Sequence, residues 1–180
     1  MKSRGFTIVE LLIVIVVIAI LAAISIVAYN GIQQRAKNSQ TVTAMAAYSK
    51  AIRSYHAVNQ NFPGTTSCAG KVGTVCGNVT DNTAPATCGG GIGPAGYEVA
   101  FGNAIKTVAS TIPEPNEQEV TCEGKKFKGI IYKNFGFAIA LYSFYKSISQ
   151  CPTISGAELF IDTSGPFGDG YMCAYTITLS

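Results

Sequence analysis

The chain has 180 residues, of which 48% are hydrophobic and 13% are charged. The charged share is about half that of an ordinary soluble domain, which excludes disorder along the whole chain. The net charge of +3 is too small to indicate a nucleic-acid surface at the level of the whole protein. His56 is the only histidine and tryptophan is absent. Most histidine-based catalytic and zinc schemes are therefore excluded, and neither a metal nor a cofactor is expected.

The hydrophobic residues are concentrated near the N-terminus. From residue 8 to residue 27, the polar side chains are Glu10 and Ser25. An apolar run of ~20 residues is long enough to cross the ~30 Å hydrocarbon core of a bilayer as a helix. We therefore expect a membrane-spanning helix at residues 6–29.

The charges in front of this helix predict its orientation. Lys2 and Arg4 are basic, and the first five residues contain no acid. Such a bias keeps the N-terminus in the cytoplasm and places the following residues outside. A secretory signal peptide is the alternative, but the apolar run exceeds the ~7–15 residues of such a peptide and no convincing small-x-small cleavage site follows it. The sequence favours a basic leader at residues 1–5 and an exported globular head at residues 30–180.

All the cysteines lie on the C-terminal side of the apolar segment. They are Cys68, Cys76, Cys88, Cys122, Cys151 and Cys173. An even number of cysteines in an exported region predicts disulfide bonds formed in an oxidising compartment. No CxxC pair or other zinc-type spacing occurs among them. Three disulfides are expected, with all 15 connectivities open.

Glu10 is an ionisable residue inside the apolar run. At membrane depth a carboxylate is costly, so it needs a partner or a function unless it reaches the nearby interface. Its neighbours complete a pattern, Gly5-Phe6-Thr7-Ile8-Val9-Glu10, that follows a basic leader and precedes an unbroken apolar helix. Over residues 1–30 this pattern resembles the prepilin signature of type IV pilins.

The resemblance implies a processing step and an assembly step. In that family a prepilin peptidase cuts after the glycine and N-methylates the new first residue, which here places the cut between Gly5 and Phe6. The free-energy cost of placing the new amine of Phe6 and the carboxylate of Glu10 in lipid is far lower when the two charges are paired than when each is alone. The glutamate is expected to neutralise the amine of a neighbouring subunit, and a pair within one chain is the competing geometry.

The second half of the sequence predicts an α+β head. Apolar residues at three- and four-residue intervals predict an amphipathic helix over 32–59 that ends before Asn61-Phe62-Pro63-Gly64. A cysteine-containing surface loop is expected over 64–96, followed by a short helical pattern from Phe101 toward Ile112. Four strands rich in Ile, Tyr, Phe and Thr follow, at 127–133, 137–145, 159–162 and 172–179. We expect a four-stranded antiparallel sheet packed on the long helix, with a hairpin connection at residues 133–136.

The resemblance also implies a disulfide and a set of partners. Such proteins often have a disulfide near the C-terminus, which favours a pair of Cys151 with Cys173. The expected partners are further copies of the chain in a helical homopolymer, the prepilin peptidase, the pilus assembly machinery and, before assembly, the cytoplasmic membrane. After assembly the protein would lie in an extracellular pilus.

An enzyme is not expected, because no residues in the sequence form a recognisable catalytic motif with His56. The basic cluster of Lys125, Lys126 and Lys128 follows a run of glutamates, so nucleic-acid binding is not expected either. The expected function is that of a structural subunit of a type IV pilus-like filament. The alternatives are a pseudopilin of type II secretion, a minor pilin for DNA uptake or adhesion, and an uncleaved membrane anchor. A glycosylation sequon at residues 78–80 is left open.

Overall fold

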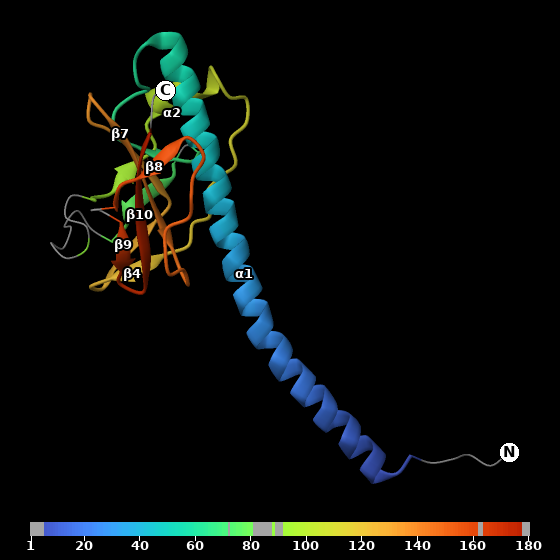
Figure 1. Ribbon diagram of the computed structural model, residues 1–180. Coiled ribbons are helices and arrows are strands. Elements are labelled where there is room, and N and C mark those ends of the chain that lie inside the picture. The colour runs from blue at the N-terminus through green and yellow to red at the C-terminus, as the bar shows by residue number, and fades with distance from the viewer. Residues whose placement is uncertain (1–5, 72, 81–87, 89–91, 162–163, 178–180) are drawn as a thin grey trace. The chain divides into compact units, whose positions relative to one another are not determined.

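The computed structural model describes residues 6–71, 73–80, 88, 92–161 and 164–177. It divides into two compact units, residues 1–36 and residues 37–180. The second is called the head unit below (Figure 1). One helix, α1 (Ile8–Asn59), contributes its first half to the N-terminal unit and its second half to the head unit.

The first half of α1 is apolar around its whole circumference. The large apolar side chains from Ile8 to Ile26 whose placement is described are all exposed, with Leu12 at 55% and Ile24 at 63%. A helix that is hydrophobic on every side is stable where it is surrounded by apolar material, either a protein core or lipid. By length and composition this segment is a candidate membrane span.

The second half of α1 packs one face into the head unit. Its buried residues recur at intervals of three and four: Thr41, Ala44, Met45, Tyr48, Ser49, Ala51 and Ile52. This spacing is the period of one helix face, as the sequence predicted. The helix ends at Asn59, and Gln60 follows with a left-handed φ of 51°. The backbone N–H of Gln60 still donates to the carbonyl of His56 at 2.8 Å.

The strands of the described residues form two antiparallel sheets, so the α+β class is confirmed. The larger sheet has the order β1-β6-β7-β10-β8, and β9 also pairs with β10; the smaller sheet has the order β3-β2-β5-β4. The strands are β1 (Ser67–Ala69), β2 (Val75–Asn78), β3 (Ala95–Gly96), β4 (Val120–Cys122), β5 (Lys125–Lys128), β6 (Ile130–Asn134), β7 (Ile139–Tyr145), β8 (Ala157–Leu159), β9 (Gly165–Phe167) and β10 (Gly170–Ile177).

The central strand β7 of the larger sheet is buried on both faces. Along β7, Ile139, Leu141 and Tyr145 belong to the core shared with α1 and with α2 (Val99–Lys106). The alternate residues Tyr142 and Phe144 belong to a second core. Since successive strand residues point to opposite faces, the strand contributes to both cores at once. In the second core Phe127 lies 4.7 Å from Phe167 and 5.6 Å from Phe144, measured between ring centroids.

A glycine transfers the chain from one sheet to the other. The strand expected at 127–133 is split at Gly129, which has a φ of 75°, so that β5 joins the smaller sheet and β6 the larger. A Cβ at this position would lie 2.7 Å from the Cβ of Cys76. Glycine meets both requirements because it has no side chain and adopts positive φ without penalty.

Three other expectations needed correction. The surface loop expected over 64–96 contains β1, β2 and β3, and Cys68 and Cys76 on these strands are fully buried. Strands this short carry too little periodicity to be recognised from sequence. The sheet on which α1 packs has six strands rather than four, and a separate four-stranded sheet is present. The second helix ends at Lys106, before the expected Ile112.

A hairpin and two strands of the larger sheet lie close to their predicted positions, with different bounds. A hairpin connection is present but lies at residues 135–138 rather than 133–136, because Asn134 at the end of β6 still pairs with Ile139 at the start of β7. The strand expected at 159–162 lies earlier in the chain, as β8 at Ala157–Leu159, and shares Leu159 alone with the expectation among the described residues, which do not include 162. The last strand is β10, which ends at Ile177, and residues 178 and 179 also lie outside them.

Candidate processing and assembly site

The predicted processing site lies at the start of α1. Lys2, Arg4 and Gly5 lie outside the described residues, whereas Phe6 and Thr7 are described and precede the helix. The side chain of Phe6 is 79% exposed. The helix begins at Ile8, so the backbone next to the predicted cut is not helical.

Thr7 and Glu10 form a capping box at the helix start. The backbone N–H of Thr7 donates to Oε2 of Glu10 at 2.8 Å, and the Thr7 hydroxyl donates to the same oxygen at 2.6 Å. In return the backbone N–H of Glu10 donates to Oγ1 of Thr7 at 3.3 Å. Thr7 occupies the N-cap and Glu10 the third helical position, which is the spacing of this motif. The carboxylate also lies at the helix terminus, where the macrodipole favours negative charge.

This geometry assigns Glu10 a local contact that sequence reasoning missed. The signal was visible, because a threonine followed three residues later by glutamate and then an apolar run is the sequence form of a capping box. Both hydrogen bonds to the carboxylate end on Oε2. A carboxylate has lone pairs on both oxygens, so Oε1 can accept from a cation while the cap persists.

The six cysteines form three disulfides in the head unit. The pairs are Cys68–Cys76, Cys88–Cys122 and Cys151–Cys173. Their Cα–Cα distances are 5.6, 6.1 and 5.7 Å, within the range that disulfide geometry requires. The pair nearest the C-terminus is the one implied by the family resemblance. The first joins β1 to β2, and therefore links the larger sheet to the smaller one.

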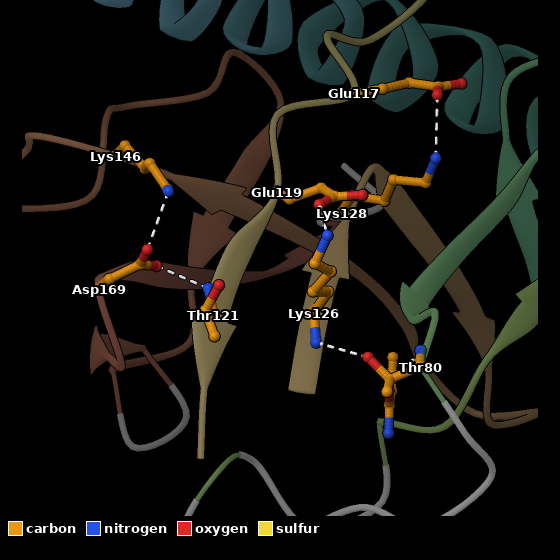
Figure 2. A network of polar contacts seen from close by, with 9 residues as sticks. Thr80, Glu117, Glu119, Thr121, Lys126, Lys128, Lys146 and Asp169 are labelled. Atoms are coloured by element: carbon orange, nitrogen blue, oxygen red, sulfur yellow. Dashed lines mark hydrogen bonds and ion pairs between the residues drawn. The ribbon is translucent and has the colours of Figure 1, made fainter. Parts of the chain in front are cut away.

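Two lysines of the basic cluster on β5 are paired with glutamates (Figure 2). The ammonium of Lys126 lies 2.8 Å from Glu119, and that of Lys128 lies 3.1 Å from Glu117. The hydrogen bond from Lys126 holds the pKa of the Glu119 carboxyl below its usual value, and the same contact raises the pKa of Lys126. These pairs offset the local positive charge that phosphate contacts would need.

Asp169 takes part in a third ion pair in Figure 2 and also links the two sheets. Asp169, in the turn between β9 and β10, accepts from the ammonium of Lys146 at 2.9 Å and from the backbone N–H of Thr121 on β4 at 2.6 Å. The backbone N–H of Asp169 donates to the carbonyl of Thr121 at 2.9 Å. This turn therefore pairs with the edge of the smaller sheet.

Two further sequence candidates are placed by the head unit. Asn78, the sequon asparagine, is fully buried and accepts a hydrogen bond from the backbone N–H of Thr80 at 3.0 Å, so a sugar cannot be attached to it in the folded head. His56 is half-buried and packs its ring on Phe62 at 4.7 Å. Among the described residues no group of three or more His, Cys, Asp or Glu side chains is placed to hold a metal ion.

Comparison with known proteins supports the interpretation of the N-terminus. The prokaryotic N-terminal methylation motif matches residues 1–26. A fimbrial protein of Neisseria meningitidis serogroup B is 34% identical over 68 residues, which are 38% of this chain and 40% of that protein. Fimbrial protein EcpC of Eikenella corrodens is 31% identical over 87 residues, 48% of this chain and 57% of that protein. The resemblance to type IV pilins is therefore confirmed.

The similarity covers part of each chain. The aligned segments span between two fifths and three fifths of the length of these two relatives. No solved structure matches the chain. The surface of the head unit is therefore characterised by its own contacts rather than by analogy with a solved relative.

Proposed function

We propose that this protein, which carries the methylation motif of type IV pilins, is the precursor of a structural subunit of a type IV pilus-like filament. The observation that carries the proposal is that the motif at residues 1–26 leads directly into an apolar helix exposed on all sides. Such a surface needs lipid before assembly and other helices after it. The role is structural rather than enzymatic.

Three parts of the chain would have separate tasks. Residues 1–5 are the cytoplasmic leader, held inside by Lys2 and Arg4. Residues 6–29 are the transmembrane and assembly helix, and residues 30–180, with the amphipathic helix at 32–59, are the exported head. The protein starts as a single-pass cytoplasmic membrane protein and ends in an extracellular pilus. The three disulfides agree with an oxidising destination for the head.

Processing is proposed between Gly5 and Phe6. Phe6 is exposed and lies outside the helix, so the peptide next to it can be held in an extended form by a prepilin peptidase. Glycine before the cut allows close approach of the protease backbone. Cleavage creates a positive amine at Phe6, which the same enzyme then methylates.

Glu10 is proposed to neutralise this amine during assembly. An amine or a carboxylate alone in a low-dielectric environment costs several kcal/mol, and a hydrogen-bonded pair recovers much of that cost. In the precursor the carboxylate is held by Thr7 through Oε2. Oε1 can then accept from the amine of a neighbouring subunit, so pairing favours the polymer over the isolated chain.

The assembly partners follow from this role. They are further copies of the chain, the prepilin peptidase, and the assembly machinery in the membrane. Nucleic acid is disfavoured as a partner of the β5 cluster, because Lys126 and Lys128 are already paired with glutamates. A pseudopilin or a minor pilin would share the processing step and differ in the product that accumulates.

The test separates the charge of Glu10 from its capping role. Glutamine at the third helical position also completes a capping box, so E10Q removes the charge and keeps the cap. Thr7→Ala is the matched variant, because it removes the threonine hydroxyl from the cap and keeps the charge. Sheared filaments would be quantified by immunoelectron microscopy and by blotting with antibody against the head.

We expect E10Q to be cleaved normally and its filament yield to fall by roughly tenfold or more, since an unpaired buried amine is strongly unfavourable. Thr7→Ala should reduce the yield much less. Normal filaments from E10Q would contradict the role of the carboxylate. If the wild-type chain is processed but supports protein secretion without surface filaments, it is a pseudopilin; if it is a rare component of filaments built from another subunit, it is a minor pilin.

A further inference from the structure

The part of α1 that follows its apolar half is basic. Residues 11–29 contain no charged side chain, and the first charged side chains after them are Arg35 and Lys37. Both of these side chains are exposed, and Tyr29 before them is 60% exposed. Residues 29–37 are called the juxtamembrane segment below, because they directly continue the candidate membrane span within one helix.

The positive charge of the juxtamembrane segment is not offset along α1. Neither Arg35 nor Lys37 forms an ion pair within the part of the chain that the structure describes. The helix contains no acid after Glu10. Two adjacent cations without an acidic partner on their own helix are therefore available to an external anion.

The acids of the head unit near this segment are already paired. The head meets α1 just beyond Lys37, where the amide of Asn38 donates to the carbonyl of Lys146 at 2.8 Å and that of Gln40 donates to the carbonyl of Glu114 at 3.0 Å. Each acid of this region forms an ion pair with a lysine, and Figure 2 shows three of the pairs. The pairs are Glu114 with Lys71, Glu117 with Lys128, Glu119 with Lys126 and Asp169 with Lys146. These acids therefore do not offset the charge of the juxtamembrane segment.

Helix geometry brings both cations toward the lipid headgroups. At a rise of about 1.5 Å per residue, Arg35 and Lys37 lie about 9 and 12 Å beyond Tyr29, a residue type that favours the membrane interface. The headgroup region adds about 5–8 Å to each side of the hydrocarbon core. Helical side chains lean toward the N-terminus, which here is the membrane end, and long basic side chains extend toward the interface. The two cations can therefore reach headgroup phosphates.

We propose that the juxtamembrane segment binds anionic phospholipid in the membrane-bound precursor, with Arg35 and Lys37 on the headgroup phosphates. This inference rests on the proposed function, which places residues 6–29 in the membrane. Lipid is the neighbour of this segment before assembly, because it already surrounds the span. An anionic lipid complements the two cations, whereas a zwitterionic lipid has no net charge. The bases do not serve as the orientation signal, since that signal favours bases on the cytoplasmic side.

The test measures lipid selection by the full chain in a bilayer. The chain is incorporated into nanodiscs with equal amounts of phosphatidylglycerol and phosphatidylcholine, and the lipids that stay bound are counted by native mass spectrometry. R35Q/K37Q removes both cations. K50Q/K106Q is the matched control, because it removes the same charge from two exposed lysines of the head unit. Lys50 lies about 30 Å beyond Tyr29 along α1, and Lys106 lies on α2, which packs on the head half of α1.

We expect the wild type and K50Q/K106Q to retain phosphatidylglycerol in preference to phosphatidylcholine. R35Q/K37Q should reduce this preference roughly twentyfold, since each base near an anionic surface contributes about fivefold. Salt should weaken the wild-type preference, because exposed charges are screened.

An unchanged preference in R35Q/K37Q would overturn the inference, and so would an equal loss in K50Q/K106Q, which would indicate a general effect of charge. Wild-type dimers that retain no lipid and are lost in R35Q/K37Q would show that a second copy covers the segment instead. These results leave the proposed function intact, because processing and filament yield are measured separately. Failure of the wild-type chain to enter the bilayer would overturn both.

Discussion

Replacement of Asp169 by alanine should destabilise the head through a single side chain that joins its two sheets. One oxygen of Asp169 accepts from the backbone N–H of Thr121 at 2.6 Å, and the other accepts from Lys146 at 2.9 Å. A hydrogen bond to a charged acceptor contributes about 1.5–3 kcal/mol. Asp169 is 48% exposed, so solvent screens the ion pair and limits its contribution to about 0.2–1 kcal/mol.

The expected loss of unfolding free energy for Asp169→Ala is therefore about 2 kcal/mol at neutral pH, toward the lower end of that range because Asp169 and Thr121 are only partly buried. For a domain of this size that lowers Tm by about 4–8 °C. Asp169→Asn keeps an acceptor for Thr121 and loses the charge, so its Tm should fall by a smaller amount. Scanning calorimetry of the full chain in detergent measures both variants against the wild type.

The same residue gives a pH dependence. Burial opposes ionisation of Asp169, but the hydrogen bonds from Lys146 and from the Thr121 backbone outweigh it and lower the pKa of the carboxyl. A lowered folded-state pKa contributes stability that is present above about pH 4 and is lost as the pH falls further. The Tm difference between wild type and Asp169→Ala should be constant near neutrality and shrink in acid. An unchanged Tm at neutral pH, or a difference that grows in acid, would refute this reasoning.

Two further predictions concern the covalent and backbone constraints of the head. Replacing both cysteines of a disulfide by serine should lower the free energy of unfolding by about 4 kcal/mol for Cys88–Cys122 and by about 2.5 kcal/mol for Cys68–Cys76, because the stabilisation grows with the logarithm of the length of the enclosed loop. Denaturant titration in detergent measures both losses, and a larger loss for Cys68–Cys76 would contradict this prediction. Gly129→Ala should lower the yield of folded protein sharply, because the new Cβ would lie 2.7 Å from the Cβ of Cys76 and the backbone has a φ of 75°. Resistance of the purified chain to protease measures the folded fraction, and a fully resistant variant would contradict the role of Gly129 at the passage from β5 to β6.

The N-terminal features could be predicted because their physics is local. An unbroken apolar run and a short basic leader need no tertiary information to indicate a membrane helix. The pattern from Gly5 to Glu10 is likewise contiguous, and the methylation motif matches it. The amphipathic half of α1 was predicted for the same reason, since its buried residues follow the helix period.

The features that sequence reasoning missed depend on contacts between distant residues. The assignment of Gly129 to a transfer between sheets depends on its closeness to Cys76, far away in the sequence. The pairing of Asp169 with Thr121 joins residues that are 48 positions apart. Strands of two or three residues, such as β1 and β3, are defined by their partners rather than by their own composition.

The capping box at Thr7 was the exception, because it was visible in the sequence and was missed. Glu10 is both a charge in an apolar segment and a helix-capping residue. The two roles are compatible, since the cap uses one carboxylate oxygen and the proposed pairing the other. The variants E10Q and Thr7→Ala separate them.

Intact-mass and tandem mass spectrometry of the subunit purified from sheared filaments tests the central proposal most directly. We predict a mature chain that begins at Phe6 and carries one methyl group on its terminal amine. A subunit that still begins at Met1, or that begins at Phe6 without the modification, would contradict it.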